Sequence, residues 1–211
     1  EYADVRNTGS TILVGEEKSY VLIDKIVAFW AKAVGGTRIH LGMDEAWGFA
    51  GAKYEKKNGK RPGVDVFLDH LNRVNAICAK HGFTEPIIWS DMFYRLASPR
   101  HDYYDPEAKA DPALAARIPK NMRLCYWDYY HDRQDYYEGM IEGHRSLGSE
   151  PILAGGIQIW SHFFHDREKT LATMSSFLAA ARKKGCKEFF FTLWGDDGAE
   201  CPYYSALAML M

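Results

Sequence analysis

The chain is poor in cysteine, close to neutral, and free of long hydrophobic runs. Its 211 residues carry four cysteines without CxxC or Cys/His spacing, so the sequence indicates neither a disulfide framework nor a zinc site. The 26 Lys+Arg nearly balance the 28 Asp+Glu, which leaves no basic excess to bind nucleic acid. No apolar run approaches the roughly 18 to 20 residues of a membrane span, so no membrane partner is expected.

Nucleotide-binding and export signals are also missing. No GxGxxG or GxxxxGK[ST] follows any strand-like run, and we expect no cofactor and no metal. The first residues, 1–7, are mostly polar, and no apolar segment of a signal peptide follows them. This slightly favours a cytoplasmic location. Because residue 1 is Glu rather than Met, however, the native N-terminus and the compartment stay open.

Aromatic residues are abundant instead. The chain has 6 Trp, 13 Tyr and 11 Phe, or 14% of all residues. Such residues fill cores, and their flat rings also stack on the apolar faces of sugars. Composition alone does not choose between these two uses.

Hydrophobic periodicity predicts short strands alternating with amphipathic helices. The expected helices cover 20–34, 64–80, 133–147 and 167–184, with a short helix near 112–117 and a last one from Pro202; the expected strands cover 37–43, 86–92, 121–130, 152–160 and 188–194. The segments 53–63 and 93–119 are expected to be loops, apart from that short helix. This order predicts an α/β fold of parallel βαβ units, either an open doubly wound sheet or part of a (β/α)8 barrel.

Polar and aromatic residues gather where these predicted strands end. Because ligands of α/β folds bind at the carboxyl edge of the strands, Trp and carboxylate side chains there indicate a sugar site. The strand ends read Asp44-Glu45, Trp89-Ser90-Asp91, Trp127-Asp128-Tyr129, Trp160-Ser161-His162 and Trp194-Gly195-Asp196-Asp197.

Asp44 and Glu45 form the strongest chemical signal. The alternative, a helix N-terminal cap, explains the pair less well than a general acid whose pKa is raised by a charged neighbour. Hydrolysis of a glycosidic bond usually needs a second carboxylate on another strand, but the strand ending at Trp160 offers none before Asp166. The missing nucleophile favours chemistry in which the substrate supplies its own.

The segment from His40 to Gly48, HLGMDEAWG, closely resembles the H-x-G-x-D-E signature of glycoside hydrolase family 20, the β-N-acetylhexosaminidases. The resemblance extends over the segments 89–92, 126–128 and 194–196. Met43 stands where many members have Gly, and Asp196 where many have Glu. The resemblance implies a TIM-barrel-type (β/α)8 fold and retaining hydrolysis of terminal β-linked GlcNAc or GalNAc through an oxazoline intermediate.

The resemblance also implies roles for individual residues. Glu45 would be the general acid/base, and Asp44 would accept the N–H of the substrate's acetamido group. Tyr129, with Tyr126 and Tyr130 as neighbouring alternatives, would donate to the acetamido oxygen. Trp127, Trp160 and Trp194 would wall the acetamide pocket, and Asp196 would bind hydroxyls of the sugar. His40 would orient the strand end or the acid, and an inward-facing, hydrogen-bonded structural histidine is the alternative for this residue. The whole predicted binding set is His40, Trp89, Trp127, Asp128, Tyr129, Trp160, Trp194 and Asp196.

Chain length fits only part of such a barrel. A complete (β/α)8 barrel takes about 250 residues, whereas residues 1–211 supply five predicted strands, which match strands 4 to 8 of the family. We therefore expect a single catalytic-domain fragment, whose open strand edges favour a homo-oligomer or pairing with the missing part of the barrel.

Three other functions share features with this sequence. A chitinase-like barrel is disfavoured, because DxxDxDxE is absent and Met43 stands where its last Asp would be. A retaining β-glycosidase with an enzyme nucleophile, supplied by Asp128 or Asp196, remains an alternative. A non-catalytic carbohydrate-binding fragment is the alternative from a different functional class.

Overall fold

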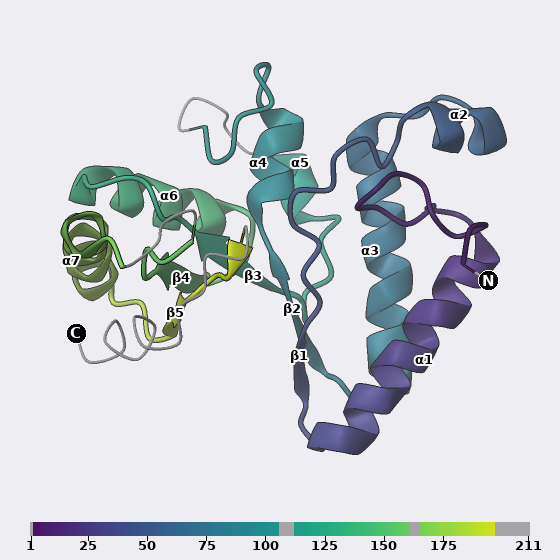
Figure 1. Ribbon diagram of the computed structural model, residues 1–211, viewed down its shortest axis with the longest axis horizontal. Coiled ribbons are helices and arrows are strands. Elements are labelled where there is room, and N and C mark those ends of the chain that lie inside the picture. The colour runs from purple at the N-terminus through teal and green to yellow at the C-terminus, as the bar shows by residue number, and fades with distance from the viewer. Residues whose placement is uncertain (1, 106–111, 161–164, 197–211) are drawn as a thin grey trace. The chain divides into compact units, whose positions relative to one another are not determined.

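The computed structural model describes residues 2–105, 112–160 and 165–196, and within them the chain forms two compact units (Figure 1). Unit 1 comprises Glu1–Arg123 with Leu147–Ser149, and unit 2 comprises Leu124–Ser146 with Glu150–Met211. The predicted helix from Pro202, and the residues His162 and Asp197, lie outside the described residues.

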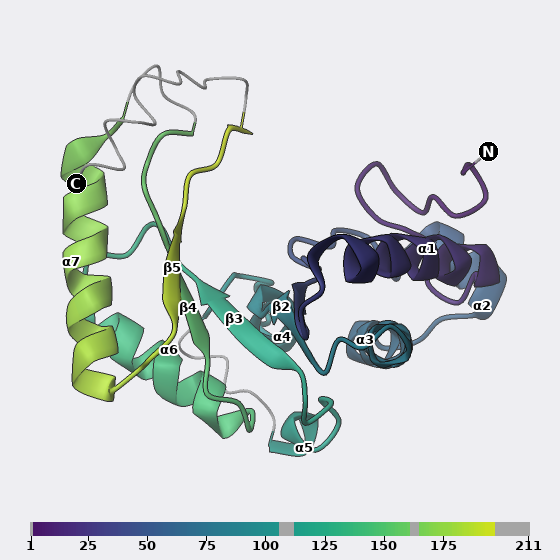
Figure 2. The ribbon, with the colours of Figure 1, turned by 90° about the horizontal axis from the view of Figure 1, so that it is seen from below.

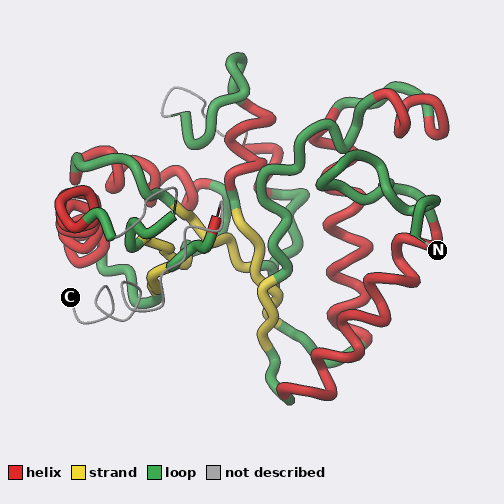
Figure 3. The backbone as a smooth tube through the Cα atoms, in the orientation of Figure 1, coloured by secondary structure: helices red, strands yellow, loops and turns green. Residues whose placement is uncertain are grey.

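Unit 1 alternates helices with two parallel strands (Figure 3). Arg38 pairs with Glu85 and His40 with Ile87, so both strands end at the same edge of the sheet. This places the residues that follow them close together. The elements are α1 (Glu17–Val34), β1 (Arg38–His40), α2 (Ala52–Asn58), α3 (Gly63–Lys80), β2 (Glu85–Trp89), α4 (Asp91–Ala97) and α5 (Pro112–Ala115).

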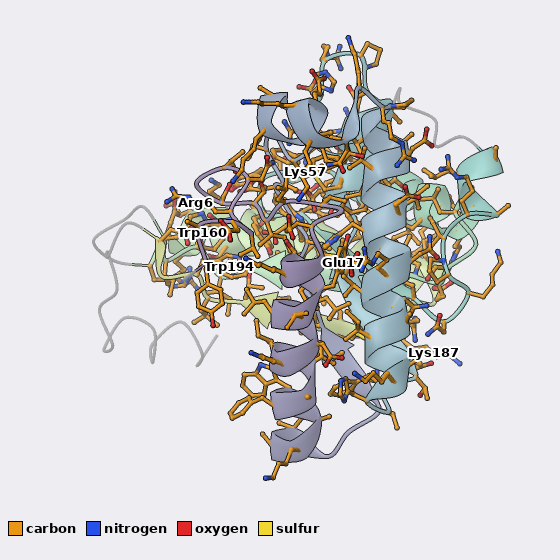
Figure 4. All side chains as sticks on the ribbon, turned by 90° about the vertical axis from the view of Figure 1, so that its right-hand side faces the viewer. Arg6, Glu17, Lys57, Trp160, Lys187 and Trp194 are labelled. Atoms are coloured by element: carbon orange, nitrogen blue, oxygen red, sulfur yellow. The ribbon has the colours of Figure 1, made fainter. Side chains whose placement is uncertain are left out.

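The long helices α1 and α3 run side by side and cover β1 (Figure 4). The carboxylate of Glu17 on α1 lies 2.8 Å from the guanidinium of Arg73 on α3. α1 ends at Gly35, which adopts the left-handed conformation (φ 61°) that glycine accepts without a steric penalty. The core beneath the two helices is formed by Tyr20, Val27, Val74, Cys78 and Phe83.

Unit 2 contains three parallel strands, and each strand pairs with the one that follows it in the sequence. β4 is the central one of the three, and its Leu153 pairs with Tyr126 of β3 on one side and Phe189 of β5 on the other. The two helices of this unit lie next to each other against the strands (Figure 2). Its elements are β3 (Arg123–Trp127, beginning at the last residue of unit 1), α6 (Gln134–Ser146), β4 (Ile152–Gly156), α7 (Arg167–Lys184) and β5 (Phe189–Thr192).

Parallel strands linked by helices confirm the predicted fold class, a partial (β/α) barrel. The four long helices are confirmed within three residues at each end, and α7 has the predicted bounds. The strands are shorter than predicted, because the polar residues at their carboxyl ends leave the sheet.

Two predictions about loops were wrong. The polar segment 53–63 forms α2 over most of its length, because Lys and Glu are good helix formers and Tyr54 is buried. The beginning of the segment 93–119 belongs to α4, in which Met92, Phe93 and Tyr94 are buried. Consecutive buried residues do not produce the helical alternation on which the sequence prediction relied.

A buried histidine of unit 2 makes stability depend on pH. The Nδ1 of His144 is 2.7 Å from the carbonyl oxygen of Met140, and burial lowers the pKa of this histidine to about 4. The unfolded chain takes up the proton near pH 6.5, so the stabilisation is complete above that pH and is lost as pH falls toward 4. At pH 5 the free energy of unfolding should be about 2 kcal/mol lower than at pH 7 from this group alone.

Urea unfolding of the protein and of a His144→Phe variant at both pH values checks this expectation. Burial also lowers the pKa values of His40 and His70 to about 4, so both proteins should lose stability in acid. The variant should lose about 2 kcal/mol less than the unmodified protein. Equal losses would show that His144 is not responsible.

Candidate functional site

The predicted acid pair lies in a strained turn directly after β1. Met43 and Glu45 have positive φ angles of 72° and 43°, and Gly42 before them has φ 72°. A left-handed conformation at a residue with a side chain costs on the order of 1–3 kcal/mol and is typical of functional sites. Two such residues beside Asp44 therefore support the interpretation of this turn as a chemical site.

Three hydrogen bonds hold the turn between the two strand ends. The backbone N–H of Glu45 donates to Oδ2 of Asp91, at the start of α4, over 3.0 Å. The N–H of Gly42 donates to Nδ1 of His40 over 3.1 Å, and its carbonyl accepts from the N–H of Trp89 over 3.0 Å. The turn conformation is thus fixed by groups from both strands of unit 1.

The environment of the turn favours uncharged forms of two of its groups. Asp44 is exposed at the surface, yet the protein atoms around it displace enough water to raise the pKa of its carboxyl group. Desolvation lowers the pKa of His40 to about 4, and its ring packs 4.4 Å from that of Trp89, which is buried. At neutral pH His40 is therefore uncharged, as its acceptor role toward Gly42 requires.

A cation and two aromatic rings lie beside Glu45. The guanidinium carbon of Arg95 sits 3.0 Å from the ring centroid of Trp47, and Tyr103 meets Trp47 edge-on at 5.8 Å. Burial raises the pKa of Tyr103, and so do the charge of Glu45 and a hydrogen bond to it. Burial lowers the pKa of Arg95, against the opposing charges of Tyr103, Asp91 and Glu45.

A cavity of about 620 Å³ within unit 1 reaches the turn. His40, Met43 and Asp44 border it, and most of the remaining lining is apolar, with side chains from the N-terminal segment, α1 and α3 such as Ile12, Val27 and Phe67. The carboxyl group of Asp44 therefore faces a largely apolar space, which is consistent with its raised pKa.

Unit 2 brings three of the predicted aromatic residues together. The ring centroid of Tyr129 lies 5.1 Å from that of Trp127 and 5.3 Å from that of Trp160, and all three side chains are buried. A Cβ atom at Gly156, the last residue of β4, would lie 2.6 Å from Tyr129 and 2.7 Å from Trp160. Glycine at this position is thus required for the two rings to approach the strand.

Tyr129, rather than its neighbours, belongs to this aromatic group. Side-chain hydrogen bonds from Thr192 and Trp194 favour its ionised form, but burial outweighs them and raises its pKa. Tyr126 instead donates to Asp128, and Tyr130 is 56% exposed. Of the three tyrosines that the sequence left open, Tyr129 is the one placed among the tryptophans.

The other predicted residues of unit 2 differ in their surroundings. Asp128 is buried and accepts four hydrogen bonds, from the hydroxyl of Tyr126, the ring of His131, and the backbone N–H groups of Tyr130 and His131. These bonds anchor the loop after β3 and occupy both carboxylate oxygens. Trp194 is 36% exposed, and Asp196 is exposed two residues further along.

Among solved structures, the chain is similar to the GH20 β-N-acetylhexosaminidase from Streptomyces coelicolor A3(2), with 20% identity and a TM-score of 0.41. It is also similar to a mutant Streptomyces plicatus β-hexosaminidase in complex with its product GlcNAc, with 17% identity and a TM-score of 0.39. Each match covers 70% of this chain and 22% of the other, so the chain spans about a fifth of these proteins. No family model and no curated protein matches the chain.

The predicted site residues fall into two groups. His40, Asp44, Glu45 and Trp89 lie together at the strand ends of unit 1. The remaining predicted residues belong to unit 2, where Trp127, Tyr129 and Trp160 are in contact.

Sequence reasoning missed three residues that surround Glu45. Asp91 was noted at a strand end but not assigned a role, and Arg95 and Tyr103 fell in the segment expected to be a loop. The unusual length of that segment was the one available signal, because long loops in compact domains are commonly functional.

Replacing Asp91 tests whether it holds the turn. Asp91→Ala leaves the N–H of Glu45 without its carboxylate acceptor and should lower the free energy of unfolding by about 1–3 kcal/mol. Asp91→Asn keeps an oxygen acceptor and should recover most of the loss. Chemical denaturation of both variants checks this, and equal destabilisation by Ala and Asn would contradict the role of the acceptor.

In the described parts of the chain, no cluster of three or more His, Cys, Asp or Glu side chains is suited to hold a metal ion. Nor does any helix described here have the length and apolar character to cross a membrane.

Proposed function

We propose that the chain is part of a glycoside hydrolase that removes terminal β-linked N-acetylhexosamine from glycans. The observation that carries the proposal is the strained turn that presents Asp44 and Glu45 at the carboxyl end of β1. The turn lies inside the segment that resembles the H-x-G-x-D-E signature. Strain at Met43 and Glu45, on either side of Asp44, is costly, and a merely structural strand end does not need it.

The proposed reaction proceeds in two steps with retention of configuration. First, the acetamido oxygen of the substrate attacks the anomeric carbon while Glu45 gives its proton to the departing glycosidic oxygen; the aglycone leaves and an oxazolinium ion, which keeps its N–H, forms. Ionised Asp44 accepts a hydrogen bond from this N–H, which orients the group and balances the positive charge that develops. Glu45 then takes a proton from water, whose oxygen attacks the anomeric carbon, breaks its bond to the oxazolinium oxygen and restores the acetamide.

The aromatic group of unit 2 supports this assignment. Tyr129 contacts both Trp127 and Trp160, and burial keeps its hydroxyl protonated and able to donate. Such a group suits the methyl and carbonyl of an acetamide. We propose that these residues, with Trp194, form the acetamide pocket that the resemblance implies.

The alternative with an enzyme nucleophile loses one of its two candidates. Asp128 is 3% exposed, and four hydrogen bonds engage its carboxylate, so it is poorly suited to attack a sugar. Asp196 is the remaining candidate for that mechanism.

A pair of substrates tests the proposed function. Release from an aryl N-acetyl-β-glucosaminide and from the matching aryl β-glucoside should be compared on the full-length protein. Hydrolysis of the first alone supports the substrate-assisted reaction, and equal turnover of both would overturn it. Absence of activity together with sugar binding would favour the carbohydrate-binding alternative.

We also propose that unit 1 pairs with a further βα unit of a barrel. The described residues place β2 on one side of β1 and no strand on the other. α1 also carries a set of exposed apolar side chains: Val21, Ile26, Phe29, Trp30 and Val34. Sedimentation of residues 1–211 should therefore show self-association, and Phe29→Ser with Trp30→Ser should reduce it. A monodisperse monomer would contradict self-association through α1.

A further inference from the structure

Trp47 is an exposed aromatic residue held rigidly next to the acid. Its side chain is 48% exposed, and its backbone N–H donates to the carbonyl of Glu45 over 2.7 Å. Arg95 lies against the ring at 3.0 Å, and Tyr103 meets it edge-on at 5.8 Å. The indole is thus fixed by a cation and by a second ring while almost half of its surface stays open to solvent.

The supports of Trp47 are themselves anchored. Arg95 on α4 donates from Nε to the carbonyl of His101 over 3.3 Å, which ties the helix to the loop that follows it. Deeper in this loop, the hydroxyl of Ser98 donates to the buried Asp105 over 2.9 Å, and the hydroxyls of Tyr104 and Ser90 are 3.2 Å apart. Tyr103 is therefore presented by a segment with buried attachments on both sides.

Core packing does not account for this arrangement. An indole that served the core would be covered, as is that of Trp89 in the same unit, which is 7% exposed. A rigid, half-open aromatic surface is instead suited to bind a flat apolar face, because little conformational entropy is lost when the ligand arrives.

We propose that Trp47, supported by Arg95 and Tyr103, forms the binding surface for the leaving-group side of the substrate, and that its ligand is a pyranose ring. This inference rests on the proposed function. The general acid must contact the oxygen that joins the terminal sugar to the leaving group, so a surface attached to Glu45 lies within reach of the ring beyond that oxygen. The preferred substrates are then oligosaccharides rather than glycosides of small alcohols.

Two substrates with the same terminal sugar separate this role from catalysis. One is a β-linked disaccharide of N-acetylglucosamine, and the other is N-acetyl-β-glucosaminyl fluoride, whose leaving group has no ring. Trp47→Ala should lower kcat/KM for the disaccharide by about tenfold, mainly through KM, because one ring contact of this kind is worth about 1.4 kcal/mol. The fluoride should be hydrolysed within about twofold of the unmodified rate.

Conservative and matched variants complete the test. Trp47→Phe keeps a ring and should recover most of the affinity for the disaccharide, and Arg95→Met should give a smaller loss than Trp47→Ala. Tyr2 is another exposed aromatic residue of unit 1, with 54% of its surface exposed. Tyr2→Ala should leave kcat/KM unchanged for both substrates.

If Trp47→Ala lowered kcat/KM equally for the disaccharide and the fluoride, the inference would be overturned, because Trp47 would then act only by supporting Glu45. Unchanged kinetics on both substrates would overturn it as well. Failure of the proposed function is a separate result, since the unmodified protein would then hydrolyse neither N-acetylglucosaminide.

Discussion

Glu45→Gln is expected to lower kcat for a disaccharide of N-acetylglucosamine by about 10²–10⁴-fold in the full-length protein. A sugar is a poor leaving group, and without a proton from Glu45 it would have to depart as an alkoxide. An aryl glycoside with an acidic phenol needs little protonation, so its first step should be affected much less. Measuring both kcat values on the same preparation isolates proton donation from folding and binding.

The amide keeps the shape of the side chain, and the backbone N–H of residue 45 can still donate to Asp91. Binding of N-acetylglucosamine, measured by calorimetry, should therefore be retained. Glu45→Asp serves as a matched variant, because it keeps the acid but shortens its reach. Glu45→Gln with unchanged kcat on the disaccharide would remove Glu45 from the role of general acid.

Much of the fold follows from local sequence signals. α7 has the predicted bounds because it lies between Asp166, which accepts the N–H of Lys169, and Gly185, in a left-handed cap. The acid pair was located correctly after β1, because the apolar run of the strand ends where Asp44 and Glu45 begin. The aromatic group of unit 2 comes from the ends of β3 and β4 and the residues after them, as the sequence predicted, and Tyr129 contacts both Trp127 and Trp160.

The remaining features depend on contacts between distant residues. Asp91 is 46 residues from Glu45, and nothing in the local pattern shows that its carboxylate binds that backbone N–H. Trp47 and Arg95 likewise meet only because α4 begins directly after β2. For Asp128 the place at a strand end predicted substrate binding, and nothing in the local pattern shows that both its oxygens accept hydrogen bonds from Tyr126 and from the loop after β3.

Asp44→Asn is the second substitution with a large expected effect. An ionised Asp44 accepts the acetamido N–H and opposes the positive charge of the oxazolinium, and an amide does neither well, so kcat/KM should fall by about 10²–10³-fold. Azide should not restore the activity, because Asp44 is not a nucleophile whose place an external anion could take. Rescue by azide with formation of a glycosyl azide would instead assign a covalent role to this carboxylate.

The pH dependence distinguishes the charge of Asp44 from its size. Desolvation raises the pKa of Asp44 above its usual 3.8, so activity should rise with pH through a value higher than that of an exposed aspartate. Below that pKa the protonated carboxyl no longer balances the developing charge. Asp44→Asn, which has no such proton to lose, should lack this acidic limb in kcat/KM. An unchanged acidic limb in the variant would show that another group controls it.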